Sequence, residues 1–498
     1  MTKKILSVLL TLIAIATALT ACAGGSKPNN AHKLVTEITT EHATDTSGFK
    51  LSYTQADSLN PFLTKTLNNQ VVETLVFDSL FVLDGNFEAQ PAIATSYVYD
   101  DAKTLNVTIP SGIVFSDGSA LTASSVVYSF EQAKYSPHWQ SMLSGISSAT
   151  ALSSTVVSFK LNHQNPAAHN LLTFAIANGD SDKNGFPIGS GRYKFSKDNG
   201  AVYLTVNKKH ADFNPHFTKI PLVNIPTAES IDNAINIGNI SYAFRDMSSG
   251  GDVKMNSNKK AVNLTNLVYI GANSYLGITA NKDIRRAISL AIDRDTIVKS
   301  AYRGYAKSAT SPFHPNSKLG RESGIFASST DLAAAKLAIT QSGVEKDNLK
   351  LGLLVNKNAE RTATAKLVKQ QLEAVGFEVE ITEMKAADYK TYVQYGRFDI
   401  YIGETRIPSD MNMLSFFGQS GSTRFGIDLQ NSETAKNYKK YLNGKGEIGS
   451  FVLSFSQEMP FIPVVYRQGM ICYSRSLQGD MQGYADNYFS NIQDWHYN

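Results

Sequence analysis

The sequence predicts an α/β protein made of more than one lobe. Between residues 349 and 402, short apolar runs alternate with segments of helical period. The order strand, helix, strand, helix, strand is the unit of a parallel sheet. The chain has 498 residues, which exceeds the roughly 250–300 residues that one hydrophobic core serves. We therefore expect two or three lobes.

The first half of the chain predicts mainly strands and turns. "FKLSYT" from Phe49 predicts a strand that runs into a turn at Asn60-Pro61, and residues 71–80 have helical spacing. Further strands are predicted at 103–109, 155–161 and 193–195, and a further helix is predicted after its cap, Thr122.

The second half predicts helices between buried strands. Apolar residues at helical spacing predict one amphipathic helix over 283–298, with Asp283 as its N-cap. The parallel unit then follows, with strands at 349–355, 377–382 and 398–402 and helices at 359–375 and 386–396. Gly376 is expected to close the first of these helices.

Polar residues follow the last of these strands. Glu404, Arg406 and Asp410 come just past the predicted strand end at Ile402. In open parallel sheets, ligands bind beyond the carboxyl ends of the strands, where loops converge on a crevice. These three residues are therefore candidate ligand contacts.

Motifs of enzymes, metal sites and nucleotide sites are absent from the sequence. The nine histidines form no H-E-x-x-H or comparable ligand pair, and there is neither a P-loop nor a G-x-S-x-G elbow. Gly189 and Gly191 lack the third glycine of a dinucleotide fingerprint. Asp100 and Asp101 are expected to be solvated turn residues. We expect no enzyme, metal or cofactor, although a triad set by geometry can be hidden from the sequence.

The first residues predict a processed leader. Lys3 and Lys4 precede an apolar stretch, 5–21, that is short for a membrane span. It ends in "LTAC", which resembles the bacterial lipoprotein signal. Residues 1–21 are then the signal peptide, and Cys22 is the lipidated first residue of the mature chain. The alternative is an ordinary cleavage site near "ALTACA".

Residues 22–47 are rich in small, polar and charged side chains and predict a flexible tether. If Cys22 carries lipid, Cys472 has no disulfide partner, and its apolar run predicts a buried position. The formal net charge of +4 gives no basic stripe for nucleic acid. The mature protein is expected outside the cytoplasm, tethered to the outer face of the cell membrane or in the periplasm.

Several stretches together resemble one protein family. In order, they are the lipoprotein signal, "DSLNPF", "QPAIATSY", "VFSDGSALTASSVVYSFEQAK", "GSGRYKF", "DIRRAISLAIDRDTI" and "MPFIPVVY". They look like the family 5 extracellular solute-binding proteins of bacterial ABC importers, the oligopeptide, dipeptide and nickel group. The resemblance covers the chain from about Phe49 to the C-terminus.

The resemblance implies a two-lobed α/β fold of the type II periplasmic-binding-protein kind, which closes on a ligand between its lobes. One lobe carries an extra subdomain, and the chain crosses between the lobes near 268–278 and 461–469. The implied boundaries are 48–75, 186–270 and 466–498 for lobe one, 76–185 for the inserted subdomain, and 271–465 for lobe two.

The sequence departs from the family at one point. Peptide-binding members resemble "ADY-x-[ED]-P" past the strand that corresponds to "FDIYIG", with an Asp that anchors the α-ammonium group of the peptide. Here the stretch reads "TRIPSDMNML", which puts Arg406 near that position and leaves Asp410 as a displaced acid. An arginine fork suits a carboxylate or a phosphate. The alternative is a structural ion pair of Arg406 with Glu404 or Asp410.

Weaker candidates lie beyond the first strand and at the two crossings. They are Tyr53 and Asn60, Tyr269 and Asn273, and Tyr466 and Arg467. Each is a candidate ligand contact, and a packing or hinge contact is the alternative for each.

The predicted function is that of a lipid-anchored receptor. It captures a peptide or another small solute and presents the closed form to the permease subunits of an ABC importer. We expect a monomer without a cofactor or catalytic residues. A surface sensor or pheromone receptor on the same scaffold is one alternative, and a secreted hydrolase with a hidden triad is the other.

Overall fold

The computed structural model describes residues 48–211, 213–247 and 257–497. The predicted signal peptide 1–21, Cys22 and the tether 22–47 lie outside the described residues. Among the helices of the described ranges, none combines the length and the apolar character needed to cross a bilayer.

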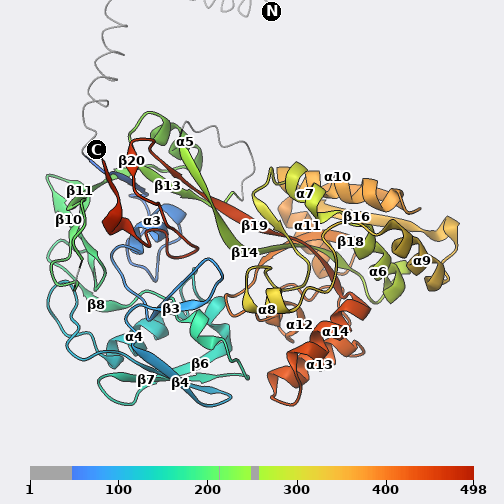
Figure 1. Ribbon diagram of the computed structural model, residues 1–498, viewed down its shortest axis with the longest axis horizontal. Coiled ribbons are helices and arrows are strands. Elements are labelled where there is room, and N and C mark those ends of the chain that lie inside the picture. Colours follow the sequence, from blue (N-terminus) through green and yellow to red (C-terminus); the bar gives the residue numbers. More distant parts are fainter. Residues whose placement is uncertain (1–47, 212, 248–256, 498) are drawn as a thin grey trace, which may run out of the picture. The chain divides into compact units, whose positions relative to one another are not determined.

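Eleven of the described strands join one mixed sheet (Figure 1). In order across the sheet they are β10 (Tyr193–Asp198), β11 (Ala201–Val206), β12 (Lys219–Asn224), β1 (Leu51–Tyr53), β13 (Tyr242–Arg245), β19 (Phe461–Tyr473), β14 (Asn258–Ala272), β18 (Ile400–Arg406), β16 (Lys350–Asn356) and β17 (Glu378–Met384), while β15 (Ala306–Ser308) pairs with β19.

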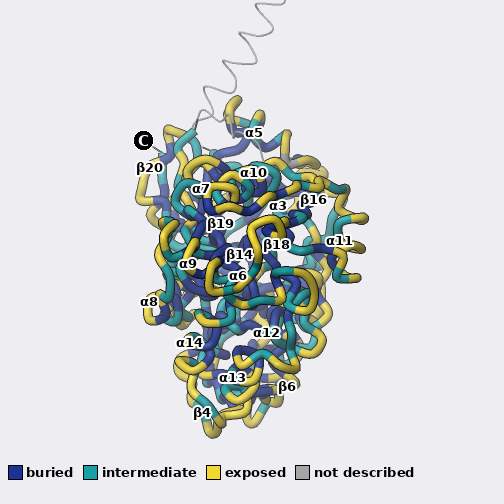
Figure 2. The backbone as a smooth tube through the Cα atoms, turned by 90° about the vertical axis from the view of Figure 1, so that its right-hand side faces the viewer, coloured by how far each residue is buried: buried dark blue, intermediate teal, exposed yellow. Residues whose placement is uncertain are grey.

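The long strands β14 and β19 join the two halves of this sheet. They pair antiparallel, and Figure 1 shows them side by side between two groups of elements. Every residue of β19 except Tyr473 is buried, and Figure 2 shows this interior course. The pairing shifts register between Asn263 and Leu267 of β14. Irregularities of this kind bend a strand locally.

Two large hydrophobic cores meet at these strands. The first core takes its residues from 49–264 and 471–495. The second core takes its residues from 267–466, together with Leu83 and Phe87. Because β14 and β19 contribute to both cores, a movement of one core relative to the other must bend these two strands.

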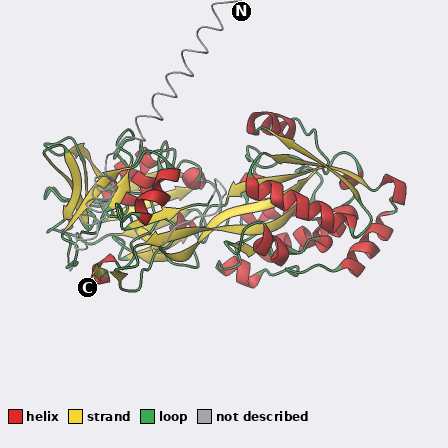
Figure 3. Ribbon diagram, turned by 90° about the horizontal axis from the view of Figure 1, so that it is seen from above, coloured by secondary structure: helices red, strands yellow, loops and turns green. Residues whose placement is uncertain are grey.

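The second core surrounds the parallel unit that the sequence predicts. β16 pairs in parallel with both β17 and β18, which confirms the predicted strand directions. Figure 3 shows helices on both sides of the strands in this half of the molecule. The helices here are α6 (Lys282–Ala291), α7 (Arg294–Ser300), α8 (Lys318–Glu322), α9 (Leu332–Ser342), α10 (Ala359–Glu373), α11 (Ala386–Gln394), α12 (Leu414–Phe417), α13 (Glu433–Leu442) and α14 (Ile448–Glu458).

The first core holds several smaller sheets beside its part of the main sheet. A four-stranded antiparallel sheet has the order β4 (Ser96–Asp101), β5 (Thr104–Thr108), β7 (Val156–Leu161), β6 (Ile146–Ala151). Two-stranded sheets are β2 (Phe81–Leu83) with β3 (Ala89–Pro91), β8 (Ala177–Ser181) with β9 (Pro187–Gly189), and β20 (Leu477–Gln478) with β21 (His496–Tyr497). The helices of this core are α3 (Leu67–Glu73) and α4 (Ala123–Ala133), while α5 (Ala228–Asn236) packs in a third, smaller core with residues of β13 and β19.

The helical spacing at 71–80 predicts a longer helix than the structure has, because α3 ends at Glu73. Beyond it, the carbonyl of Val76 accepts a hydrogen bond from Gly191 N (2.9 Å) instead of continuing the helix. A Cβ atom at position 191 would lie 2.5 Å from the carbonyl carbon of Val76. The close contact therefore requires glycine, which explains one glycine of "GSGRYKF".

The single helix predicted over 283–298 is wrong, because the structure has two helices there. The N-cap of α6 is Asn281, whose side chain accepts a hydrogen bond from Asp283 N (2.8 Å). Ile292 leaves the helical conformation, and the Asp293 carboxylate caps α7 by accepting a hydrogen bond from a backbone N–H of its first turn (2.9 Å). A capping carboxylate at this position competes with continuation of the first helix.

The last predicted strand is too short. β18 runs on to Arg406, which stands opposite Asn266 of β14, so Glu404 and Arg406 are strand residues rather than loop residues. The strand continues because β14 supplies a pairing partner over its whole length. The C-cap of α10 is Ala374, and Gly376, with φ +110°, follows two positions later.

Candidate ligand-binding cleft

A cavity of about 340 Å³ lies where the two cores face each other. Its walls come from the region of α3, the hairpin β2–β3, the end of β13, the register shift of β14, the end of β18 and the C-terminal segment. Its lining includes two basic residues, Lys65 and Arg406, and two acidic residues, Asp246 and Asp486. This cavity is called the cleft below.

An ion pair between Arg406 and Asp486 crosses the cleft. The Nη2 atom of Arg406 donates to Oδ2 of Asp486 at 2.7 Å, while 38% of the arginine side chain stays exposed. Burial alone would raise the pKa of Asp486, but Arg406 and His138, whose Nε2 lies 3.6 Å away, hold that pKa well below its usual range. Asp486 has φ +58°, a conformation uncommon outside glycine that concentrates at functional sites.

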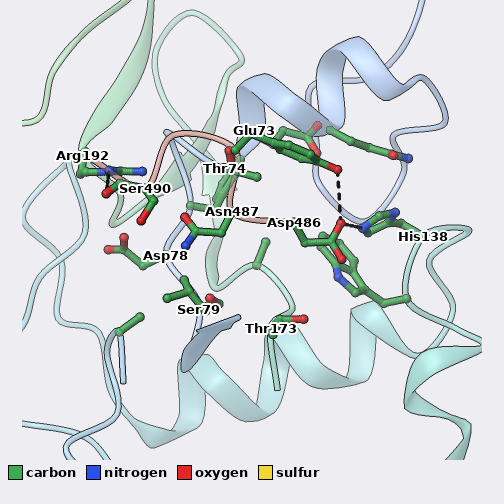
Figure 4. A pocket seen from close by; sticks show the side chains of 17 residues that line it. Glu73, Thr74, Asp78, Ser79, His138, Thr173, Arg192, Asp486, Asn487 and Ser490 are labelled. Carbon is green, nitrogen blue, oxygen red and sulfur yellow. Dashed lines mark hydrogen bonds and ion pairs between the residues drawn. The ribbon is translucent and has the colours of Figure 1, made fainter. Parts of the chain in front are cut away.

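A second cavity, of about 230 Å³, opens beside the cleft and is called the rear cavity here (Figure 4). Gln70, His138, Asp486 and Tyr488 line both spaces. The two cavities are therefore neighbours that share one wall of polar side chains. Figure 4 shows Asp486 and His138 in contact on one side of the rear cavity and Arg192 on the opposite side.

The polar groups at the Arg192 side are largely occupied. Nη1 of Arg192 donates to the carbonyl oxygens of Phe489 (2.7 Å) and Ser490 (3.4 Å). The Asp78 carboxylate accepts a hydrogen bond from Ser190 Oγ (3.0 Å). These contacts fix the C-terminal segment and the β9–β10 connection against the first core.

Two other groups of the rear cavity are unusual for buried polar atoms. The indole Nε1 of Trp139 is buried and has no hydrogen-bond partner among the residues that the structure describes. Glu73 is buried and accepts a hydrogen bond from Thr64 Oγ1, and burial raises the pKa of its carboxyl group well above the usual value. A buried donor without an acceptor is costly unless a ligand supplies one.

Glu404 lies deeper than Arg406, inside an ionic network at the register shift. Its carboxylate accepts hydrogen bonds from Arg467 Nη1 (2.7 Å) and from Asn266 Nδ2 (3.1 Å), and Arg361 Nη1 lies 3.4 Å away. Arg467 also donates to the carbonyl of Asp246. Both Glu404 and Arg467 therefore have structural partners, and neither lines the cleft.

Asp410 is buried where the second core meets the first. Its carboxylate accepts hydrogen bonds from Asn165 Nδ2 (2.7 Å) and from the side chain of Asn412, and burial raises its pKa. Asp410 lines only a small space of about 20 Å³, apart from the cleft. Arg406 pairs with neither Glu404 nor Asp410, the two partners considered from the sequence, because its ion-pair partner is Asp486.

The structure places the weaker candidates away from the lining of the cleft. Tyr269 packs among Tyr401, Phe416 and Phe461 in the second core. Tyr53 is buried in its strand, and the Asn60 side chain accepts a turn hydrogen bond from Phe62 N. Asn273 Nδ2 donates to the carbonyls of Gly396 and Phe398. The Tyr466 hydroxyl donates to the carbonyl of Pro312. Of the residues predicted for the site, Arg406 lines the cleft.

Sequence reasoning missed the residues that surround Arg406. Asp486 lies 80 positions further along the chain, in a segment with no periodic pattern, and His138 follows α4 in the first core. No sequence signal separates these residues from the other Asp and His residues of the chain. The cluster exists only because the C-terminal segment folds back onto the first core.

Comparison with known proteins places the chain among solute receptors. The profile of the bacterial extracellular solute-binding proteins, family 5, middle region, matches residues 88–425. The glutathione-binding protein GsiB of Escherichia coli K12 is 24% identical over 356 residues, which is 68% of this chain and 69% of that protein. The oligopeptide-binding protein AppA of Bacillus subtilis is 24% identical over 426 residues, 76% of each chain.

Solved structures share the fold. A putative peptide-binding protein AppA from Clostridium difficile superposes with a TM-score of 0.72 at 20% identity, covering 91% of this chain and all of that one. NikA from Brucella suis superposes with a TM-score of 0.68 at 18% identity, covering 90% of this chain and all of that one. These similarities extend the type II periplasmic-binding-protein architecture to this chain.

Proposed function

Because the chain belongs to the bacterial extracellular solute-binding proteins of family 5, we propose that its cleft binds a zwitterionic solute such as a short peptide. The chain is the extracytoplasmic receptor of an ABC importer, a class whose members bind a solute and work with permease subunits. The family is one of binding proteins rather than enzymes.

The ion pair of the partly exposed Arg406 with Asp486 carries this proposal. Arg406 uses one amino group for Asp486 and keeps further N–H donors toward the cleft. A guanidinium group presents five donors in a planar fork that matches a carboxylate. A carboxylate of the solute binds beside this fork, while an amine of the solute is attracted to Asp486 and Asp246, which also line the cleft.

The balance of charge favours a zwitterion over a simple anion or cation. The cleft sets Lys65 and Arg406 against Asp246 and Asp486, so a solute with charge of one sign would meet a like charge close by. Glutathione and oligopeptides, which give two relatives their names, both carry amine and carboxylate groups. The rear cavity then receives one side chain of the solute, and Trp139 Nε1 donates to an acceptor on it.

The first experiment identifies the solute and tests Arg406. The small molecule that copurifies with the protein is identified by mass spectrometry and then used for titration calorimetry. A hydrogen bond to a charged group contributes about 1.5–3 kcal/mol, so Arg406→Ala should weaken binding by roughly 10- to 150-fold. Arg406→Lys should recover only part of this loss, since an ammonium group forms no bidentate fork.

Thermal melting of the same variants separates binding from folding. If Arg406→Ala binds the solute as the wild type does, Arg406 is not an anchor. If that variant melts much earlier with its affinity intact, the ion pair with Asp486 is structural only. A copurifying solute that lacks either a carboxylate or an amine group would also contradict the proposal.

The membrane anchor is a separate part of the proposal. Cys22 carries lipid and holds the mature chain at the outer face of the membrane, as the stretch "LTAC" after a charged and apolar leader indicates. Cells are fed labelled palmitate, and incorporation into the wild type is compared with incorporation into Cys22→Ala. We expect label only in the wild type, and equal labelling of the two proteins would exclude lipidation at this cysteine.

A further inference from the structure

The tip of the hairpin β2–β3 belongs to a different core from its base. At the base, Phe81 packs in the first core, and its N–H donates to the carbonyl of Leu172 (3.2 Å). At the tip, Leu83 and Phe87 pack in the second core. The hairpin therefore spans from one core to the other.

The contact of Phe87 with the second core is an aromatic plug. Its side chain is 2% exposed, its ring centroid lies 4.6 Å from that of His314, and the His314 ring lies 4.7 Å from that of Tyr466. Burial lowers the pKa of His314 to about 3, so the receiving ring is neutral at physiological pH. An edge-to-face contact between buried neutral rings stabilises the docked position beyond the area that it buries.

The backbone of the tip is held in a conformation that phenylalanine rarely adopts. Phe87 has φ +64°, in the left-handed region where side chains other than glycine are disfavoured. The Asp84 carboxylate accepts hydrogen bonds from Asn86 N (2.8 Å) and Glu88 N (3.0 Å), and this turn keeps the tip in shape. The plug is thus presented by a preformed turn.

Hydrogen bonds tie the same tip to the strands that must bend. The carbonyl of Gly85 accepts from Asn263 Nδ2 (3.2 Å) and from Asn316 Nδ2 (3.5 Å). Asn263 pairs with Gln468 of β19 immediately before the register shift, and Gln468 Nε2 donates to its Oδ1 atom (2.8 Å). The tip therefore contacts the second core and the bend in β14 together.

Leu83 and Phe87 also line the cleft. From these contacts we propose that the hairpin tip is a latch, which docks Phe87 against His314 when the two cores close and must withdraw before the solute can leave. The latch proposal rests on the proposed function in one respect: a solute bound in the cleft can be exchanged only when the cores separate. It sets how long the closed state lasts, independently of which solute is bound.

Single-molecule Förster resonance energy transfer between dyes on the two cores tests the latch. Dyes are placed at Ser153→Cys and Lys346→Cys, two exposed positions that belong to different cores, in the full chain carrying Cys22→Ser. Dwell times in the closed state are recorded without added solute. Phe87→Ala removes the buried ring contact that holds the closed state, and we expect the closed-state dwell time to shorten by about tenfold, the change that corresponds to about 1.4 kcal/mol. Phe87→Leu keeps part of the contact and should shorten the dwell time less.

The exposed neighbour Asn86 supplies the matched control, because its side chain faces solvent at the same tip. Asn86→Ala should keep the dwell time of the wild type. If Phe87→Ala does not fold, Asn316→Ala removes one donor to Gly85 and should shorten the dwell time by a few-fold. Dwell times within twofold of the wild type in a folded Phe87→Ala protein, or no closed population in the wild type, would overturn the latch.

A failure of the proposed solute class gives a different result. A defined peptide, tri-L-alanine, is added to the wild type in the same experiment, followed by the copurifying solute. If neither changes the closed population while Phe87→Ala still shortens the dwell time, the latch stands and the proposed solute class does not.

Discussion

Two ionic residues of one strand have opposite roles. Glu404 and Arg406 lie two positions apart on β18, so their side chains leave the same face of the sheet. Glu404 is enclosed by Arg467 and Arg361, whereas Arg406 reaches the open space of the cleft and meets Asp486. The difference follows from position along the strand: Glu404 stands opposite Val268 of β14, within reach of the Arg467 side chain from β19, and Arg406 lies at the strand end.

The buried pair of Glu404 with Arg467 should therefore matter for stability. Only 4% of the Arg467 side chain is exposed, and removing one partner of a buried ion pair leaves the other charge uncompensated. We expect Glu404→Gln to lower the free energy of unfolding by about 3 kcal/mol, the lower end of the range for broken buried pairs. Urea denaturation followed by circular dichroism measures the change.

A surface ion pair provides the control for this measurement. Lys436 and Glu433 are both largely exposed, so Lys436→Gln should leave the urea midpoint unchanged. In the double variant Glu404→Gln with Arg467→Met, the cost should be smaller than the sum of the single costs, because Arg467 is no longer left as a buried charge without its partner and only Arg361, at 23% side-chain exposure, keeps its charge there. Additive costs in that variant would mean that the two residues act separately.

At this scale the sequence predicts only one part of the site. Arg406 could be predicted because it follows the carboxyl end of a predicted parallel strand, where ligands bind in open α/β sheets. Asp486, His138 and Trp139 could not be found, because their place depends on tertiary contacts of irregular segments. Tyr269 was suggested as a ligand contact, but its ring fills the second core, since a tyrosine at a crossing can point to either face.

At the scale of elements, hydrophobic periodicity located most strands and helices but not their ends. The parallel strands β16, β17 and β18 are where the apolar runs predict them. The failures at α3 and at α6–α7 arise where another hydrogen bond competes with the helix: a long-range bond from Gly191 N to the Val76 carbonyl in one case and a capping Asp293 in the other. Such competition is decided by partners that a periodic pattern does not contain.

The caps of α6 allow a direct test of this point. Asn281 accepts the capping hydrogen bond, while Asp283 lies in the first turn and pairs with Arg286 at the surface. Asn281→Ala should lower the free energy of unfolding by about 1 kcal/mol, the usual cost of losing an N-cap. Asp283→Ala should cost less, because it loses a charge near the helix N-terminus and a surface ion pair with Arg286, each of which contributes little.

Urea unfolding curves of the two variants, recorded side by side with the wild type, measure these costs. The order of the two effects is the informative result. A larger loss for Asp283→Ala would assign the cap to the residue that the sequence alone favoured, and would contradict the hydrogen bond seen at Asn281.

At the scale of the whole molecule, the two cores are joined by a narrow pair of strands. β14 and β19 shift register between Asn263 and Leu267, opposite Tyr466 and Gln468. The cleft, the network around Glu404 and the hairpin latch all meet at this point. A hinge at two strands permits one core to rotate against the other with little change inside either core.

Closure around a solute should therefore make the molecule more compact. Small-angle scattering is recorded on protein freed of its copurifying solute and again after that solute is added back. We expect the radius of gyration to fall on addition, because hinge closure brings the two cores together. At a solute concentration that saturates only the wild type, the radius of gyration of Arg406→Ala should fall less than that of the wild type. A scattering profile of the wild type that stays unchanged at saturation would show that binding proceeds without movement of the cores, and that the bend in β14 and β19 is a fixed feature of the sheet.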